Sequence, residues 1–456
     1  MAKRHEIDMT EGSILKKVLQ YALPMILSSA LHVLFHSADT VIVGRFAGSL
    51  SMAAVGSTGS LVALLVNLFT GLAAGTNVMS ARYYGSREYE KLSDLLHTSI
   101  AFSLVLSLLL GGGGALLARP LLVLMKSDPA VLPLSALYLQ IYFLGTPFQL
   151  IYLFASTVLR ALGDTKRPLF FSLVSNGVNI LLNLLFVVVL RMDVAGVAIA
   201  TALSHAVSCF LVLRVLARAD GPYRFYVHKL KLKRTHLWDI VRIGLPVGLN
   251  STVFNIANVS IQSAINSLGT VAMAGDTAAR TLDGLIATSM SAFLNAVVPF
   301  TSQNVGAKKY HRLGRIYLVC TLLSMTVAII IATVIRLLGV PLLGMFIPAD
   351  DPARDAVIAA GLVRLTIIGL PYFLCGMLDV ASGFLRGTGR SWTPFLIAVI
   401  CTCAVRIAWI SLVFPVRPTA EILYLCFPLS WLLTAIVTSC FSFPCLWKYT
   451  RQKTSA

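Results

Sequence analysis

The sequence has little charge. Asp, Glu, Lys and Arg make up 12% of its 456 residues, whereas soluble domains carry about 25%. Hydrophobic residues make up 57% of the chain, and the mean hydropathy is +0.82. Apolar runs such as residues 96–117 and 318–340 are long enough to cross a bilayer, which takes about 20 helical residues. The composition excludes a soluble globular protein and predicts an all-α polytopic membrane protein.

Several features of other protein classes are missing. The eight cysteines lie mostly inside apolar runs without CxxC spacing, so we expect small core residues rather than disulfides or a metal site. The polar start "MAKRHEIDMTEGSILKKV" has no secretory cleavage site after it. The motifs HExxH, GxSxG and DxxD are also absent, which argues against an enzyme. We expect no cofactor beyond a transported ion.

Acidic residues are scarce as well: 19 Asp and Glu accompany 37 Lys and Arg, for a net charge of +18. About twelve spans start near residues 14, 51, 92, 131, 169, 194, 236, 270, 310, 356, 393 and 420. Every second connection between spans, counted from the N-terminal segment, carries most of the basic residues. The connections between them hold only Arg45, Arg119, Lys126, Arg191, Arg336, Arg354 and Arg417. The positive-inside rule then predicts cytoplasmic termini, and it accounts for the basic charge without nucleic acid.

The two halves of the chain resemble each other. "ALPMILSS" (22–29) aligns with "GLPVGLNS" (244–251), and "LRALGDTKRP" (159–168) aligns with "LRGTGRSWTP" (385–394). Six spans in each half make the repeat parallel, an architecture in which substrate sites lie near the bilayer midplane between the halves. We predict an N-lobe over residues 1–216, a basic cytoplasmic linker over 217–235 and a C-lobe over 236–456.

The first span carries an acidic residue, Asp39. His32, His36 and Asp39 are spaced i, i+4, i+7 and share one helix face. Ionisable side chains inside a span are costly and point to function. Asp39 is therefore a candidate site for a proton or a cation, and the histidines are a candidate proton relay or a packing contact. Pro24, earlier on the same helix, can act as a hinge because it removes a backbone hydrogen bond.

Amides and one hydroxyl follow in the fifth and sixth spans. Asn179 and Asn183 lie one turn apart, and Thr201 lies in the sixth span. Their oxygens could bind Na⁺, which prefers oxygen ligands, or hydrogen-bond a protonated carboxyl. Amides can equally hold two helices together.

The seventh span carries a polar seam of four amides: Asn255, Asn258, Gln262 and Asn266. A seam without formal charge suits a broad organic substrate, so these residues are candidates for a substrate cavity. In the eighth span, the spacing of Asp276, Arg280 and Asp283 predicts ion pairing within the helix. Asp379 in the tenth span has no obvious partner and is a second candidate for proton or substrate binding.

The sequence resembles the multidrug and toxic compound extrusion (MATE) family, in its bacterial branch. The likeness extends from about residue 12 to about residue 447, and four motifs carry it: "ADTVIVGRFAG" (38–48), "AAVGSTGS" (53–60), "LRALGDTKRP" (159–168) and "TSQNVGAKKY" (301–310). The resemblance implies a V-shaped pair of six-helix lobes in the bacterial cytoplasmic membrane. It also implies exchange of an organic substrate for Na⁺ or H⁺ by alternating access.

The resemblance also implies roles for single residues. Pro24 and Asp39 match the first-span residues of N-lobe cation coupling, and Thr201 matches a sixth-span threonine. Asn179 and Asn183 fall on an Asn-x-x-x-Asp pattern, but Asn183 stands where many relatives have Asp. Asp39 would then be the only acid of the site, which leaves the choice between Na⁺ and H⁺ open. The C-lobe carboxylates of some relatives have no clear match here.

We therefore expect a monomeric cation-coupled exporter of amphipathic organic compounds. Two alternatives stay open. A flippase for lipid-linked oligosaccharides would need a cationic cavity, for which Arg280, Arg364 and Arg406 are the arginines deep in spans. A multipass membrane enzyme would need a catalytic motif that the sequence lacks.

Overall fold

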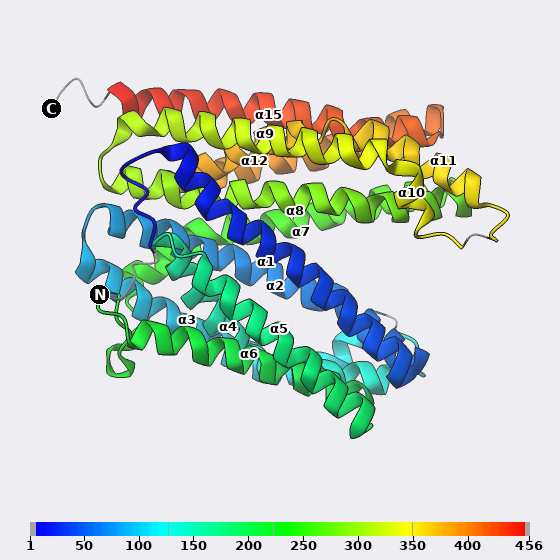
Figure 1. Ribbon diagram of the computed structural model, residues 1–456, viewed down its shortest axis with the longest axis horizontal. Coiled ribbons are helices and arrows are strands. Elements are labelled where there is room, and N and C mark those ends of the chain that lie inside the picture. The colour runs from blue at the N-terminus through cyan, green and yellow to red at the C-terminus, as the bar shows by residue number, and fades with distance from the viewer. Residues whose placement is uncertain (1–5, 126, 222, 349, 452–456) are drawn as a thin grey trace. The chain divides into compact units, whose positions relative to one another are not determined.

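The computed structural model describes residues 6–125, 127–221, 223–348 and 350–451, apart from the side chains at 32–34, 36–41, 49 and 450. Figure 1 shows the described chain as helices joined by short connections. This confirms the all-α class. The helices of the first half are α1 (Ile14–Ile42), α2 (Gly48–Gly85), α3 (Tyr89–Leu124), α4 (Leu132–Ala161), α5 (Lys166–Asn183) and α6 (Asp193–Ala217).

The second half combines long helices with several short, broken ones. They are α7 (Arg234–Asn266), α8 (Thr270–Gly306), α9 (Leu313–Leu337), α10 (Gly339–Gly344), α11 (Arg354–Arg364), α12 (Tyr372–Gly387), α13 (Trp392–Ile397), α14 (Val405–Ala408) and α15 (Ala420–Arg451). Wider π-helical turns continue several of them: η1 (Val43–Ala47), η2 (Leu184–Val189), η5 (Leu365–Gly369), η6 (Ala398–Ala404) and η7 (Trp409–Val413). Short 3₁₀ turns complete the chain at η3 (Val227–Lys229), η4 (Tyr310–Arg312) and η8 (Phe414–Val416).

Within the described residues, eleven helices are long and apolar enough to cross a membrane, or twelve if one bent pair counts as a single span. The protein is therefore a multi-pass membrane protein. The bent pair consists of Arg354–Gly369 and Tyr372–Gly387, which meet at 40°. Pro371 lies at this break, directly before α12. Because proline lacks a backbone N–H, it cannot continue the helical hydrogen bonding. The sequence predicted one span that starts near residue 356 and gave no position for a bend.

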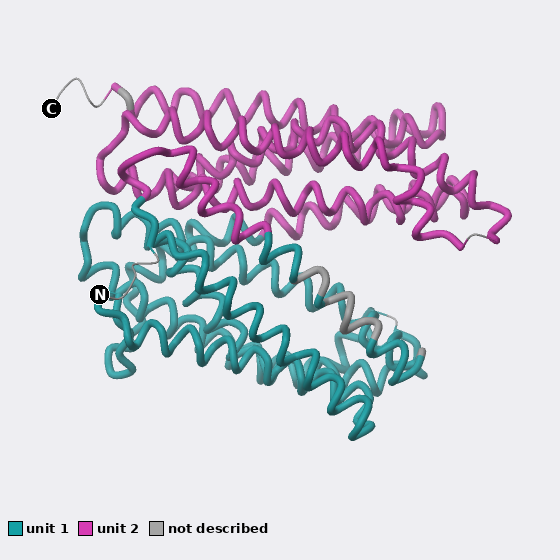
Figure 2. Tube along the Cα trace, in the orientation of Figure 1, with its two compact units in different colours: residues 1–8, 27–248 teal, residues 9–26, 249–456 magenta. Residues whose placement is uncertain are grey.

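By its contacts the chain divides into two compact units (Figure 2). Unit 1 holds residues 1–8 and 27–248, and unit 2 holds residues 9–26 and 249–456. Each change of unit inside a helix falls two residues after a proline, Pro24 in α1 and Pro246 in α7. These are the prolines that the repeat aligns. The units thus differ from the predicted lobes at the first parts of α1 and α7.

In unit 1, glycines hold the first part of α7 against α2. A Cβ atom on Gly71 would lie 2.1 Å from the backbone nitrogen of Gly248, and one on Gly75 would lie 2.2 Å from the carbonyl oxygen of Ile240. Backbones can approach this closely only where a side chain is absent. This contact explains why residues 234–248 belong to unit 1.

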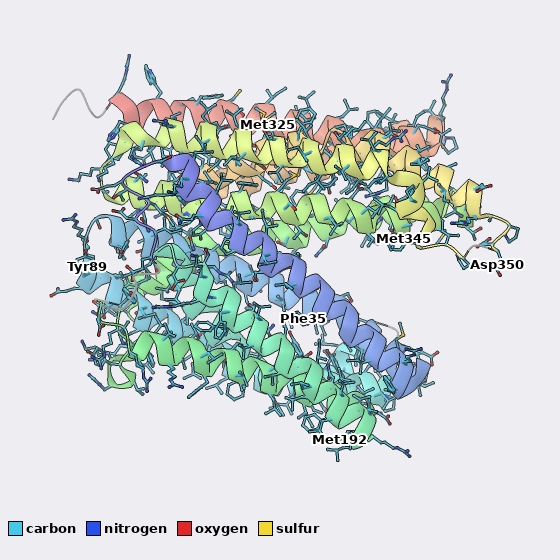
Figure 3. All side chains as sticks on the ribbon, in the orientation of Figure 1. Phe35, Tyr89, Met192, Met325, Met345 and Asp350 are labelled. Carbon is cyan, nitrogen blue, oxygen red and sulfur yellow. The ribbon has the colours of Figure 1, made fainter. Side chains whose placement is uncertain are left out.

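Figure 3 shows Tyr89 and Met192 at opposite ends of the unit 1 helices. At the Tyr89 end, the segment before α1 docks onto unit 1 through Glu6. The Glu6 carboxylate accepts hydrogen bonds from the hydroxyls of Tyr84, at 2.9 Å, and of Tyr223. Burial, together with the Glu6 carboxylate, raises the pKa of Tyr223, so its phenol stays a neutral donor.

The next residues dock onto unit 2. Met9 is fully buried, its N–H donates to Oε1 of Gln303 at 3.3 Å, and its carbonyl accepts from Nδ2 of Asn304 at 3.0 Å. Lys309 pairs with Glu11 at 3.0 Å. Gln303, Asn304 and Lys309 all belong to the motif "TSQNVGAKKY". In the structure, this motif forms the dock for the segment that precedes α1.

Candidate functional site

The first-span residues predicted from the sequence all lie on α1. Pro24 is half-buried and the helix continues through it. His32, His36 and Asp39 lie on the same helix, but their side chains are outside the described part of the chain. Their predicted roles therefore rest on the sequence.

The structure brings two of the predicted amides of α5 together. Nδ2 of Asn183 donates to Oδ1 of Asn179 at 3.2 Å, and the two residues are 0% and 7% exposed. Helix α5 ends at Asn183, where the π-helical segment η2 begins. Such wide turns often mark functional sites because they turn backbone groups and side chains out of register.

The segment that follows α1 meets the segment that follows α5. The π-helical segments η1 and η2, both in unit 1, are in contact. Asp39 precedes η1 by four positions, and Asn183 directly precedes η2. The backbone therefore places these two residues close to the same contact between helices.

Thr201 does not join this pair by a described hydrogen bond. Its hydroxyl donates to the carbonyl of Val197 in its own helix at 2.9 Å. A described hydrogen bond that links α5 to α6 comes instead from Ser175, two turns before Asn183, whose hydroxyl donates to the carbonyl of Ser204 at 2.6 Å.

The polar seam of α7 is partly exposed and partly tied to α8. Asn255 and Asn258 are exposed. Nε2 of Gln262 donates to Oδ1 of Asn266 at 2.9 Å, while Oε1 of Gln262 accepts from Arg280 at 2.8 Å. Through Gln262 the seam therefore contacts Arg280, one of a cluster of charged side chains around α8.

That cluster is a buried ion-pair network in unit 2. Asp276 is fully buried and binds two arginines, Arg280 at 2.8 Å and Arg364 at 2.6 Å. Arg364 also binds Asp283 at 3.0 Å, and the Tyr424 hydroxyl donates to Asp276 at 3.0 Å. Two buried carboxylates face two guanidinium groups, so the formal charges of the cluster cancel.

The sequence predicted ion pairing within α8, which holds for Asp276 and Arg280 only. Asp283 is bound by Arg364 from α11, which comes 81 positions later. Helix α11 can approach α8 closely because Gly275 has no side chain. A Cβ atom at this position would lie 2.7 Å from the carbonyl oxygen of Val357. A signal was present in the sequence, since Arg364 is an unpaired charge within a span, but local spacing could not identify its partners.

Two further charged residues of unit 2 lie apart from this network. Asp379 is half-buried on α12, and the charged group that acts on it is Arg386, two turns further along the same helix. Arg406 of α14 is 3% exposed, and its Nε donates to the Ser430 hydroxyl at 3.0 Å. The sequence pointed to Arg406 only as one of three deep arginines that a flippase cavity would need.

A groove of about 520 Å³ runs along a face of α8 that does not carry the network. It is lined by Thr270, Met273, Ala274, Thr277, Ala278, Thr281, Phe346 and Ile347. Among the described residues, no group of three His, Cys, Asp or Glu side chains could hold a metal ion.

Comparison with known proteins places these features in a family. The MatE family model matches residues 24–185 and 246–410. The chain is 29% identical to the probable multidrug resistance protein YpnP of Bacillus subtilis over 89% of each chain. It is 25% identical to the multidrug export protein MepA of Staphylococcus haemolyticus over 85% of each chain. The solved structure of a MOP superfamily transporter from Pyrococcus furiosus shares the fold, with a TM-score of 0.89 and 21% identity over 97% of this chain and 98% of that one.

Proposed function

We propose that this chain, which belongs to the MatE family, exports amphipathic organic compounds across the cytoplasmic membrane in exchange for H⁺ or Na⁺. The observation that carries the proposal is a polar site within apolar spans in each unit: the buried amide pair of unit 1 and the partly exposed amide seam of unit 2. The names of the two relatives support a drug-like substrate.

In the proposed mechanism the coupling ion binds at Asp39. The amides of Asn179 and Asn183 help to solvate it, because oxygen donors replace the hydration shell of a cation and also accept from a protonated carboxyl. The contact between η1 and η2 supports this grouping, since it brings the helix ends that follow Asp39 and Asn183 together. Thr201, bonded within its own helix, is a weaker candidate ligand.

Neutralising Asp39 is the step that couples the ion to movement. Inside the membrane a carboxylate is costly, and binding a proton or a cation lowers that cost. Pro24 weakens α1 because its ring removes a backbone hydrogen bond. The change of unit after residue 26 supports Pro24 as the hinge, because bending at this point requires no break within either unit.

Substrate binding is assigned to the amide seam of α7. The exposed Asn255 and Asn258 can donate and accept hydrogen bonds without selecting one charge. Gln262 and Asn266 are fixed by each other and by Arg280, so they position the seam rather than contact a ligand freely.

The flippase alternative receives less support. It would need free cationic groups for phosphates, but Arg280 and Arg364 are bound to Asp276 and Asp283. Of the three deep arginines, only Arg406 lacks an acidic partner among the described residues. Membership of a family whose relatives are named as transporters also favours transport over an enzyme.

The test is efflux from proteoliposomes. We expect a fluorescent amphipathic dye to be driven out by either a Na⁺ gradient or a pH gradient, and we expect Asp39→Asn to abolish that flux while still folding. Asp193→Asn, at an exposed position at the start of α6, is the matched control and should behave as wild type. Flux that neither gradient changes would reject the coupled mechanism.

A further inference from the structure

Arg406 is a buried charge in the middle of a predicted span. It lies on the short helix α14, between the π-helical segments η6 and η7 of the span Trp392–Val416, and only 3% of it is exposed. A charged group in such a position is costly unless it is paired. A balance of charges, as in the Asp276 network, would reduce that cost.

Arg406 has no such balance. Its described hydrogen bond is from Nε to the Ser430 hydroxyl, and that hydroxyl donates in turn to the carbonyl of Phe427 at 2.8 Å. A guanidinium has five N–H donors, and the planar fork formed by its outer nitrogens fits a carboxylate with two hydrogen bonds. Among the described residues, no carboxylate lies within ion-pair distance of this fork, in contrast to Arg280 and Arg364.

Aromatic rings form one wall beside the guanidinium. The carbon at its centre lies 4.3 Å from the ring centroid of Phe427 and 5.9 Å from that of Trp431. Trp431 in turn contacts Tyr372, with 4.8 Å between the ring centroids. Stacking on a ring face stabilises the cation and leaves the N–H groups at its edge available. The same rings can contact the apolar part of an aromatic ligand.

One face of α12 provides an approach to this position. Tyr372, Cys375 and Asp379 are spaced i, i+3, i+7, and all three are half-buried rather than buried. Tyr372 and Cys375 interact electrostatically with Arg406. Two half-buried residues of α12 therefore lie near the guanidinium.

We infer that Arg406 binds the carboxylate of an exported compound, so that the substrate class of this protein includes aromatic amphiphiles with an acidic group. The inference rests on the proposed export function and names a part of its substrate. The carboxylate would meet the free fork of Arg406, and the aromatic body would lie against Phe427, Trp431 and Tyr372. Cationic dyes without an acidic group would lack this contact.

The test uses two dyes that differ in one group. Rhodamine 110 carries a free benzoic acid, and rhodamine 123 is its methyl ester. Binding is followed by fluorescence polarisation on the purified protein in detergent, without any ion gradient. We expect the wild type to bind the free acid more tightly by a factor on the order of ten, as for a hydrogen bond to a charged group. Arg406→Gln should remove this preference.

Two further variants keep the test decisive. Arg417→Gln, at an exposed arginine, should keep the wild-type preference. If Arg406→Gln does not fold, Arg406→Lys should keep the charge but reduce the preference, because an ammonium lacks the planar fork. The inference is overturned if the wild type does not prefer the free acid or if Arg406→Gln keeps the preference. Ion-driven export is tested separately, since retained dye binding without gradient-driven flux would count against the coupling alone.

Discussion

Nη1 of Arg364 lies 2.6 Å from Oδ1 of Asp276, although 88 positions separate the two residues. Nε of the same guanidinium binds Asp283. One arginine on α11 thus neutralises two carboxylates on α8, and all three side chains are at most 5% exposed. The network links the end of α11, in the first part of the bent pair, to α8.

We expect Arg364→Gln to destabilise the protein strongly. It would leave two buried carboxylates short of a partner, and removing one member of a buried ion pair typically costs about 3–5 kcal/mol. The free energy of unfolding in detergent measures the effect. Arg280→Gln is the matched comparison, because the Arg280 side chain is 45% exposed and its ion pair should contribute about 1 kcal/mol or less. Equal losses in the two variants would contradict this description of the network.

Alanine at two glycines of α2 should have opposite effects. In Gly71→Ala, the new Cβ would lie 2.1 Å from the backbone nitrogen of Gly248, so α7 has to move away. Overpacking of this kind costs about 1–3 kcal/mol. Gly56 has open space around it, and Gly56→Ala should stabilise the helix by about 0.5–1 kcal/mol. Melting temperatures of the two variants test the contact, and a neutral Gly71→Ala would refute it.

Two substitutions distinguish the members of the proposed cation site. Asn183→Leu removes the hydrogen bond to Asn179 and should raise the cation concentration needed for half-maximal transport by about tenfold, the value of one hydrogen bond to a charged group. Thr201→Val should have little effect, because the Thr201 hydroxyl donates to its own helix. Transport rates over a range of pH and Na⁺ concentration measure both. A loss in Thr201→Val as large as in Asn183→Leu would place Thr201 in the site, as the family resemblance implied.

The segment before α1 should loosen when Glu6 is replaced. Glu6→Ala removes the acceptor for Tyr84 and Tyr223, so we expect the amides of residues 6–9 to exchange hydrogen faster. Glu11→Ala is the control, because the Glu11 side chain is 66% exposed in its ion pair with Lys309 and such pairs contribute little. Exchange followed by mass spectrometry separates the two. Unchanged exchange in Glu6→Ala would show that the two tyrosines do not hold the segment.

Much of the fold could be predicted from the sequence because its signals are local. Long apolar runs set the spans, and all the predicted starts fall close to observed helix starts. The pairing of Asn179 with Asn183 also follows from their spacing of one turn. The sequence analysis did not predict the bend before α12, although Pro371 was a signal for it. A proline inside an apolar run is compatible with either a kinked helix or two separate helices.

The charged network could not be predicted in the same way. Arg364 finds its partners across a contact that depends on Gly275 and on how α11 packs against α8, neither of which is visible in local spacing. Arg406 was noticed only as one of three deep arginines. The structure distinguishes Arg406 from the other two. Arg280 and Arg364 bind Asp276 and Asp283, whereas Arg406 has no acidic partner among the described residues.

In the proposed exchange, a cation bound at Asp39 lowers the affinity of the protein for its substrate. Thermodynamic linkage then requires that bound substrate lowers the affinity for the cation by the same factor. The most direct measurement is the dissociation constant of a fluorescent substrate for purified protein, titrated against pH and against Na⁺ for wild type and Asp39→Asn. The account predicts that one of the two cations weakens substrate binding in wild type and has no effect in Asp39→Asn. Substrate binding that depends on neither cation in wild type would contradict it.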